Sequence, residues 1–267
     1  MHGNPCRILG IRSLEDVIYG VDEHGRLFKF QNAKFTWLLD ENHAVLRDLK
    51  PGFFNDLVVV KKMIYITDSF TYHPTFHPLQ RFFSFENSGR ILGYNLENGE
   101  LKVVADGLYL PNGIELYHDN RSLLVSECSM FRVVRFDIES KTISPFIENT
   151  FGAVDNIRRS NDGGYWIGLS ATRFTSSSLL DFLGRYPALR HILTNKALLP
   201  LLLLHDTVYG TGPALYKVDS KGATLHLLTD PHKLTKTISF SEIHEIGEQI
   251  FVGTPFSPHI FVFLNLK

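Results

Sequence analysis

The segment Met63-Ile-Tyr-Ile-Thr67 decides the fold, because four similar segments recur along the chain. Each is a short run of β-branched, aliphatic or aromatic residues, the composition of a buried β-strand. The other four read Val17-Ile-Tyr-Gly-Val21, Ser122-Leu-Leu-Val-Ser126, Tyr165-Trp-Ile-Gly-Leu169 and Gln249-Ile-Phe-Val-Gly253. Five copies of one strand type predict a repeated, all-β architecture.

A further strand follows each copy, and most of these strands alternate apolar and polar residues. They cover residues 25–30, 89–94, 131–136, 214–218 and 259–263. A fourth strand follows at residues 35–39, 101–105, 144–147 and 223–228, whereas the last copy ends at Lys267 without one. Four-stranded units that repeat at intervals of about 40 to 60 residues are typical of β-propeller blades. We therefore expect one propeller domain over residues 1–267, with about five blades.

One stretch, residues 178–205, interrupts this rhythm with apolar residues at helical spacing. It predicts a helical insertion, divided by Pro187 and Pro200. The insertion either caps one rim of the propeller or forms a substrate lid or a membrane-touching patch.

Composition excludes several classes of protein. The 267 residues are 44% hydrophobic and 21% charged, as in an ordinary globular protein. With 27 Lys and Arg against 28 Asp and Glu, no basic surface is available for nucleic acid. The longest aliphatic run, Leu198–Leu204, is far shorter than the roughly 20 residues of a membrane span. The first seven residues, Met1–Arg7, lack the apolar core expected of a signal peptide. Cys6 and Cys128 leave one bridge or two free thiols open.

Polar residues repeat in the segments expected to line the central channel. Phe53-Phe-Asn-Asp-Leu57, Leu110-Pro-Asn-Gly-Ile114 and Val154-Asp-Asn-Ile157 place their amides and carboxylate at matching blade positions. Oxygen donors of this kind are the ligands that Ca²⁺ prefers. Any one of them could instead simply make a turn. Because the pattern repeats three times, we favour a metal site with the ligands Asn55, Asn112, Asp155 and Asn156.

Three further residues are weighed as candidates for the functional site. His244, in Ser241-Glu-Ile-His-Glu245, is a candidate catalytic base, and a hydrogen-bonded core histidine is an equal alternative. Asp68 and Glu127 end strands, where turn or blade-to-blade hydrogen bonds are the expected role.

Two short motifs lie in expected loops. The histidine-rich stretch 72–77 reads as a loop rather than a metal pair. Asn120-Arg-Ser122 is an N-glycosylation sequon and suggests a glycoprotein of the secretory pathway.

At these residues the chain resembles the strictosidine synthase-like family of six-bladed propellers, in particular its membrane-associated branch. The resemblance spans nearly the whole chain. It rests on Phe54-Asn-Asp-Leu57, Ile66-Thr-Asp-Ser69, Leu110-Pro-Asn-Gly113, Asp155-Asn-Ile157, Gly163-Gly-Tyr-Trp-Ile-Gly168, Leu180-Asp-Phe-Leu183, Ser241-Glu-Ile-His-Glu245 and Phe256-Ser-Pro258.

The resemblance implies a calcium-supported propeller related to paraoxonase-type calcium hydrolases, with arylesterase-like or lactonase-like activity. Asn55, Asn112, Asp155 and Asn156 fall on the metal positions of that pattern. The cation of such enzymes polarises a carbonyl or phosphoryl oxygen, and Asp155 would supply the catalytic carboxylate.

Two departures from the family pattern matter. Ser241 stands where alkaloid-forming synthases carry an essential glutamate, which disfavours strictosidine synthase activity. Relatives also begin with a cytosolic tail, a membrane anchor and a first blade that supplies an acidic calcium ligand. We expect this chain to lack that blade, as a fragment, a shortened isoform or a truncated gene product would, and to bind calcium more weakly.

The sequence thus predicts a calcium-dependent hydrolase-like propeller acting on a small-molecule ester or lactone. The alternative is a non-catalytic, membrane-associated or secretory-pathway propeller, with a structural calcium, that binds a protein or lipid partner at its rim. Localisation at the endoplasmic reticulum or cell surface follows from the resemblance alone. Membrane association would require an anchor that this chain does not contain.

Overall fold

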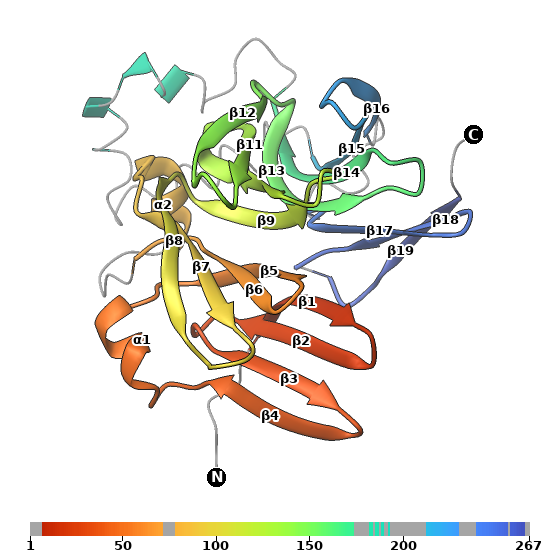
Figure 1. Ribbon diagram of the computed structural model, residues 1–267. Helices are drawn as coiled ribbons and strands as arrows, with labels where there is room; N and C mark the ends of the chain where they lie inside the picture. Colours follow the sequence, from red (N-terminus) through yellow and green to blue (C-terminus); the bar gives the residue numbers. More distant parts are fainter. Residues whose placement is uncertain are drawn as a thin grey trace. The chain divides into compact units, whose positions relative to one another are not determined.

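The computed structural model of the chain consists almost entirely of short β-strands (Figure 1). It describes residues 7–71, 78–173, 182–183, 185–186, 188–189, 192, 212–229, 239–255 and 257–264. Within these residues the strands form five small sheets. Inside each sheet, every strand pairs with the strand that comes before or after it in the sequence. This repeated meander is the blade unit of a β-propeller, so the prediction of an all-β, propeller-type fold with about five blades is confirmed.

The strand bounds are as follows. The first sheet holds β1 (Ile8–Leu14), β2 (Val17–Asp22), β3 (Leu27–Gln31) and β4 (Lys34–Leu39). The second holds β5 (Phe54–Val60), β6 (Met63–Asp68), β7 (Gly89–Asn95) and β8 (Leu101–Leu108). The third holds β9 (Pro111–Leu116), β10 (Ser122–Glu127), β11 (Arg132–Asp137) and β12 (Ile143–Ile147). The fourth holds β13 (Gly152–Arg159), β14 (Tyr165–Thr172), β15 (Ala214–Val218) and β16 (Thr224–Thr229). The fifth holds β17 (Glu242–Ile246), β18 (Gln249–Gly253) and β19 (Phe261–Leu264).

The five apolar segments predicted as second strands are β2, β6, β10, β14 and β18, and the predicted bounds differ by at most a few residues. The fifth sheet has three strands among the described residues, as expected. The sequence analysis had not assigned an inner strand to the first sheet, and β1 supplies it.

Short helices were not predicted. They are α1 (Ala44–Leu49), α2 (Pro78–Ser84) and the 3₁₀ turn η1 (Cys128–Met130). Helix α1 ends at Lys50, which adopts the left-handed conformation and returns its N–H to the carbonyl of Leu46. Helix α2 begins with a proline, a residue that fits the first helical position because it needs no hydrogen bond from its nitrogen.

Two sequence predictions fall largely or wholly outside the described residues. They are the helical insertion near residues 178–205 and the histidine-rich loop at residues 72–77. Of the described residues in the insertion, all but Tyr186 are helical, namely Phe182, Leu183, Arg185, Ala188, Leu189 and Ile192.

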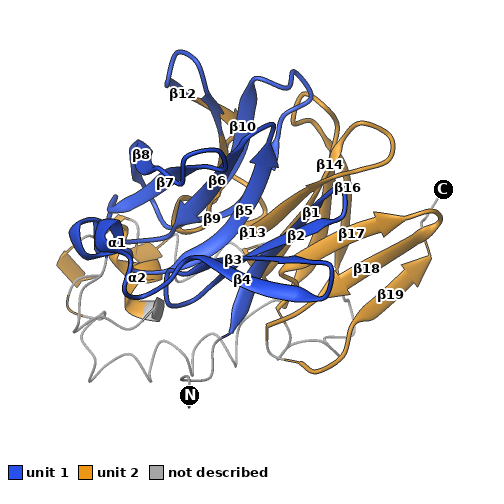
Figure 2. Ribbon diagram, turned by 60° about the horizontal axis from the view of Figure 1, so that its bottom comes forward, with its two compact units in different colours: residues 1–75, 86–125, 135–143 blue, residues 76–85, 126–134, 144–267 orange. Residues whose placement is uncertain are grey.

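The chain divides into two compact units (Figure 2). Unit 1 comprises residues 1–75, 86–125 and 135–143, and contains the first two sheets with β9. Unit 2 comprises residues 76–85, 126–134 and 144–267, and contains the last two sheets with α2.

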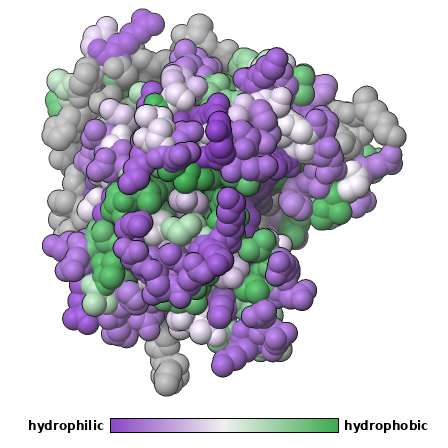
Figure 3. Space-filling model, in the orientation of Figure 1, coloured by the Kyte–Doolittle hydropathy of each residue, from purple (hydrophilic) through white to green (hydrophobic). Residues whose placement is uncertain are grey.

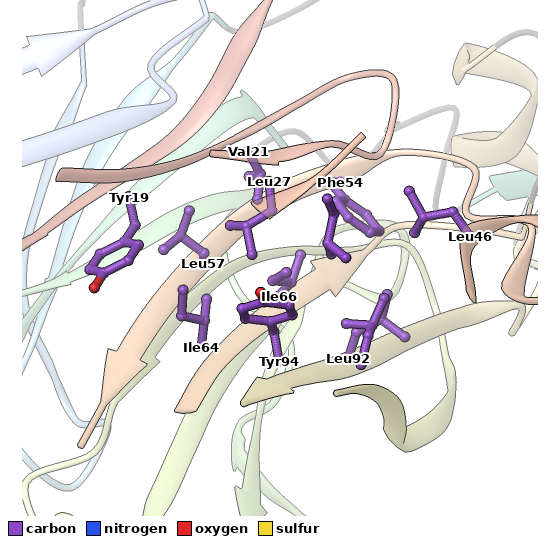
Figure 4. Packing of buried hydrophobic residues seen from close by; sticks show 12 residues of the cluster. Tyr19, Val21, Leu27, Leu46, Phe54, Leu57, Ile64, Ile66, Leu92 and Tyr94 are labelled. Atoms are coloured by element: carbon purple, nitrogen blue, oxygen red, sulfur yellow. The ribbon is translucent and has the colours of Figure 1, made fainter. Parts of the chain in front are cut away.

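The core of unit 1 lies between the first two sheets (Figure 4). Tyr19 and Val21 of β2 pack with Leu57 of β5 and with Ile64 and Ile66 of β6. In unit 2, Trp166 and Leu215 of the fourth sheet pack with Ile243, Ile250 and Val252 of the fifth. The first and second sheets, and likewise the fourth and fifth, thus bury apolar faces against each other, as blades do.

Two further properties bear on the sequence predictions. No helix among the described residues is long and apolar enough to span a membrane. Cys128 is a free, buried thiol.

Candidate metal centre

The inner strands β5 and β13 each carry a β-bulge at the segment that the sequence analysis singled out. Phe54 pairs with Asp68 and Leu57 with Ile66, which leaves one extra residue on β5. The register of β13 against β14 shifts in the same way between Val154 and Ile157. Asn55 and Asp155 therefore occupy equivalent places in their sheets. A bulge re-aims side chains that regular alternation would fix, which suits a binding site.

In unit 1 the amide of Asn55 is oriented by a serine. Its Nδ2 donates to Ser69 Oγ over 3.4 Å, and Ser69 Oγ donates to the carbonyl of Pro111 over 2.8 Å. Thr67 Oγ1 binds the main-chain carbonyl of Asn112, the next residue along β9. These hydroxyls connect the segment of Asn55 to the segment of Asn112. The side-chain Oδ1 of Asn112 is buried and has no hydrogen-bond partner within the part of the chain that the structure describes.

In unit 2 the amide of Asn156 is held in a similar way. Its Nδ2 donates to Ser241 Oγ over 3.2 Å, and its main-chain N–H donates to the carbonyl of Ser241 over 3.2 Å. The residue is only 7% exposed. Its Oδ1, like that of Asn112, is buried and finds no hydrogen-bond partner among the described residues.

An unpaired buried amide oxygen is costly, by about 1 to 3 kcal/mol. Native proteins therefore rarely retain one unless a water or an ion satisfies it. Here two unpaired oxygens belong to asparagines that the sequence had predicted as metal ligands. Carbonyl oxygens of this kind suit a hard cation such as Ca²⁺.

Asp155 is the carboxylate of the predicted ligand set and is half-buried. Its negative charge acts on the pKa of the buried Cys128 thiol. Burial raises the pKa of Cys128 well above its ordinary value, and the negative charge of Asp155 raises it further. Both effects favour the neutral thiol over the thiolate, which is the form that binds soft metals.

The four predicted ligands divide between the two units, with Asn55 and Asn112 in unit 1 and Asp155 and Asn156 in unit 2. Within each unit, hydrogen bonds position the amides. The convergence of all four on one ion stays a prediction. Among the described residues, no three His, Cys, Asp or Glu side chains gather into a metal-binding group. A site at these positions would consist mainly of amide oxygens.

His244, the candidate base, lies on β17 opposite Phe251 of β18. Its side chain is exposed, while its neighbours Ile243 and Glu245 are buried on the other face of the strand. The strand alternation expected from the sequence is present. The exposed position does not support either a core histidine or a base held in a buried site.

Sequence reasoning missed the ion pairs between inner strands. Arg12 of β1 donates to Asp56 of β5 over 3.1 Å, and the fully buried Asp56 also accepts the N–H of Ile114 over 3.0 Å. In unit 2, Arg158 of β13 pairs with Glu242 of β17. Asp56 stands directly beside Asn55, but nothing in the sequence indicated its partner.

The acids that end the second strands have structural roles, as expected for Asp68 and Glu127. Asp68 pairs with Arg90 and accepts the N–H groups of Gly52 and Phe53 over 3.1 Å each. Burial raises the pKa of Asp68, although Arg90 and the two N–H groups act in the opposite direction. The equivalent pairs in the adjoining sheets are Asp22 with Arg26 and Glu127 with Arg132.

The predicted sequon lies in the turn before β10. Asn120 is exposed, whereas Ser122 is fully buried and its hydroxyl bonds to Asp119 and Arg135. In the folded chain the serine hydroxyl is therefore engaged, and glycosylation stays a prediction.

The chain is similar in sequence to a known family model and to several known proteins. Residues 55–141 match the family model of strictosidine synthase. The adipocyte plasma membrane-associated protein of Danio rerio is 35% identical over 218 residues, covering 78% of this chain and 51% of that protein. Its counterpart from Rattus norvegicus is 31% identical over 265 residues, covering 95% and 69%. The chain thus spans about half to two thirds of the length of these relatives.

Solved structures show the same fold at low identity. A gluconolactonase from Xanthomonas campestris is 14% identical with a TM-score of 0.57, covering 92% of this chain and 67% of that one. A calcium-binding regucalcin from Agrobacterium tumefaciens is 14% identical with a TM-score of 0.55, covering 92% and 66%. At this identity the likeness concerns the fold alone.

Proposed function

Because the chain belongs to the family of the adipocyte plasma membrane-associated proteins and contains a strictosidine synthase segment, we propose that it is a calcium-dependent hydrolase acting on esters or lactones. The observation that carries the proposal is the pair of buried, unpaired amide oxygens on Asn112 and Asn156. The fold likeness to a gluconolactonase and to a calcium-binding regucalcin supports the same chemistry.

The residues that would hold calcium are Asn55, Asn112, Asp155 and Asn156. Serine hydroxyls fix two of the amides through their nitrogens, Ser69 for Asn55 and Ser241 for Asn156. An amide whose nitrogen is engaged presents its carbonyl oxygen in a set direction. When bound, calcium polarises the carbonyl oxygen of the substrate.

Asp155 would supply the catalytic carboxylate. It would either attack the ester carbon, displacing the alcohol to form an acyl-enzyme anhydride that water hydrolyses, or take a proton from a water that attacks the carbon and displaces the alcohol. Its half-buried position allows both contact with a substrate and partial exclusion of water. Phenyl acetate is a suitable arylester probe for this activity.

The experiment is the substitution Asp155→Asn, which removes the charge and keeps the shape. We expect hydrolysis of phenyl acetate in excess calcium to fall by about 100-fold or more. Asp137→Asn is the matched control, because Asp137 is a carboxylate that caps a surface turn through Glu139 and Ser140. Equal activity in the wild type, Asp155→Asn and the control would contradict the enzyme proposal.

The second candidate is a non-catalytic propeller whose calcium is structural, with a protein or lipid partner at its rim. The names of the relatives favour membrane association, which makes the secretory pathway or cell surface the proposed location. Thermal unfolding of Asp155→Asn in excess calcium separates the two proposals. The enzyme requires activity to vanish while the melting temperature is mostly kept, whereas loss of both together favours the structural role.

Calcium affinity adds an independent test. Only one of the four proposed ligands is charged, and calcium sites weaken as their charge count falls. We therefore expect a dissociation constant well above about 1 µM in calorimetric titration. Submicromolar binding would show that the ligand set contains further carboxylates.

A further inference from the structure

The first sheet has one face of apolar side chains open to solvent. Ile18 pairs with Phe30, and Phe30 pairs with Phe35, so the three form a row across β2, β3 and β4. They are 39%, 40% and 47% exposed, and Ile11 on the same face is 53% exposed. Phe35 stacks on Phe28 with ring centroids 4.9 Å apart. We call this set the β1–β4 open face.

The fifth sheet also has an apolar face open to solvent. Phe251 pairs with both His244 and Val262, so these three residues form a row across one face of the sheet. Two residues further along the strands, the next row on that face includes Ile246 and Leu264. Ile246, Val262 and Leu264 are 57%, 52% and 75% exposed. We call this set the β17–β19 open face. Figure 3 shows hydrophobic residues lying among hydrophilic ones on the side of the molecule that faces the viewer.

The β1–β4 open face matches, position by position, a face that is buried in the second sheet. Strands β2 and β6 both have six residues and end in aspartate, so Ile18 is equivalent to Ile64. Their partners Phe30 and Tyr94 are equivalent as well. Ile64 and Tyr94 are buried in the core between the first two sheets (Figure 4). The β1–β4 open face thus has the pattern of a face that packs on a preceding sheet.

The β17–β19 open face has the complementary pattern. In the fourth sheet, Trp166 pairs with Arg158 and Lys217. This row faces the fifth sheet, because Trp166 packs there and Arg158 pairs with Glu242. In the fifth sheet, the equivalent of this row is formed by His244, Phe251 and Val262. It lies on the opposite face of the sheet from the buried row of Ile243 and Val252.

We propose that the β17–β19 open face of one molecule packs against the β1–β4 open face of a second copy. The contact repeats the junction that already joins consecutive sheets inside the chain, with the same kind of face on each side. Two copies of the same face would not reproduce it, so the contact is heterologous. Apolar patches of this kind on a soluble protein mark interaction surfaces.

The test uses charged substitutions on one face at a time in the 267-residue chain. Phe35→Asp alters the β1–β4 open face, and Val262→Asp alters the β17–β19 open face. Leu225→Asp is the matched control, because Leu225 on β16 is 46% exposed and belongs to neither face. Molar mass is measured by sedimentation velocity over a range of protein concentrations, and circular dichroism verifies the fold of each variant.

We expect the wild type and Leu225→Asp to self-associate with the same dissociation constant. Each face variant should bind itself at least about tenfold more weakly, whereas an equimolar mixture of the two should form a one-to-one complex through the two intact faces. Ile18→Gln and Leu264→Gln replace either aspartate variant that fails to fold. A monomeric wild type at all concentrations would overturn the proposal, and so would a mixture that shows no complex.

Discussion

In both units an inner strand packs against the neighbouring sheet, but the residues that make the contact differ. In unit 1, Thr67 and Ser69 bridge to the main-chain carbonyls of Asn112 and Pro111. The register makes Gly168 the equivalent of Thr67 in unit 2, because Ile66 pairs with Leu57 as Ile167 pairs with Ile157.

Glycine at this position lets the strands of unit 2 approach directly. A Cβ on Gly168 would lie 2.5 Å from the carbonyl oxygen of Ser241. What the two units share is an arginine–carboxylate pair between the inner strands of consecutive sheets, β1 with β5 and β13 with β17, and an asparagine oxygen left unpaired among the described residues. The unpaired oxygen is present in both units although its surroundings differ, as the proposed calcium site requires.

The largest difference between the junctions should appear when the arginines are removed. Asp56 is fully buried, whereas Glu242 is 36% exposed. Arg12→Met leaves a buried carboxylate without its cation and should cost about 3 to 5 kcal/mol of unfolding free energy. Arg158→Met should cost only about 1 to 2 kcal/mol, because water can reach Glu242. Urea denaturation measures both values, and equal costs would contradict the assigned burial.

Exchanging the contacts at the equivalent positions sharpens the comparison. Gly168→Ala forces a methyl group against the carbonyls of Phe240 and Ser241, and should cost about 2 to 3 kcal/mol. Thr67→Val keeps the shape but removes the hydroxyl that bonds to Asp56 and Asn112, and should cost about 1 to 2 kcal/mol. An alanine at position 168 with wild-type stability would show that the two strands are not in direct contact.

A smaller effect depends on pH and belongs to unit 2. Burial acts to raise the pKa of Glu245, but hydrogen bonds from Ser160, Asn161 and Trp166 outweigh it and lower that pKa. A lowered folded-state pKa stabilises the fold above the ordinary value of about 4.3, and this contribution is lost as the pH falls through the folded-state pKa.

Glu245→Gln tests this linkage. The variant should be less stable than the wild type by about 1 kcal/mol at pH 7, and the gap should close in acid. Urea denaturation at neutral pH and near pH 3 to 4 measures the gap. A gap that widens on acidification would contradict the direction of the shift.

The strands could be predicted because their signal is local. Five similar apolar segments and the alternating strands after them specify the sheets without knowledge of distant contacts. Helix α1 was missed because six residues are too few to show a helical period. The bulges at Asn55 and Asp155 were missed because they exist only in the register between two strands.

The candidate site was predictable in part for the same reason. The repeated asparagines stand out in the sequence, and two of them carry the unpaired oxygens. The pairs of Arg12 with Asp56 and of Arg158 with Glu242 join residues 44 and 84 positions apart. Such pairs are created by the packing of sheets, which composition and spacing do not encode.

The most direct test of the account is the effect of calcium on thermal unfolding of the wild type, Asn112→Ala and Asn156→Ala, with the exposed Asn120→Ala as control. A ligand that binds the folded state raises the melting temperature with its concentration. We predict that calcium stabilises the wild type and the control, and that each site variant loses most of this stabilisation. If calcium leaves the wild type unchanged, or shifts all four proteins equally, the unpaired oxygens are not calcium ligands.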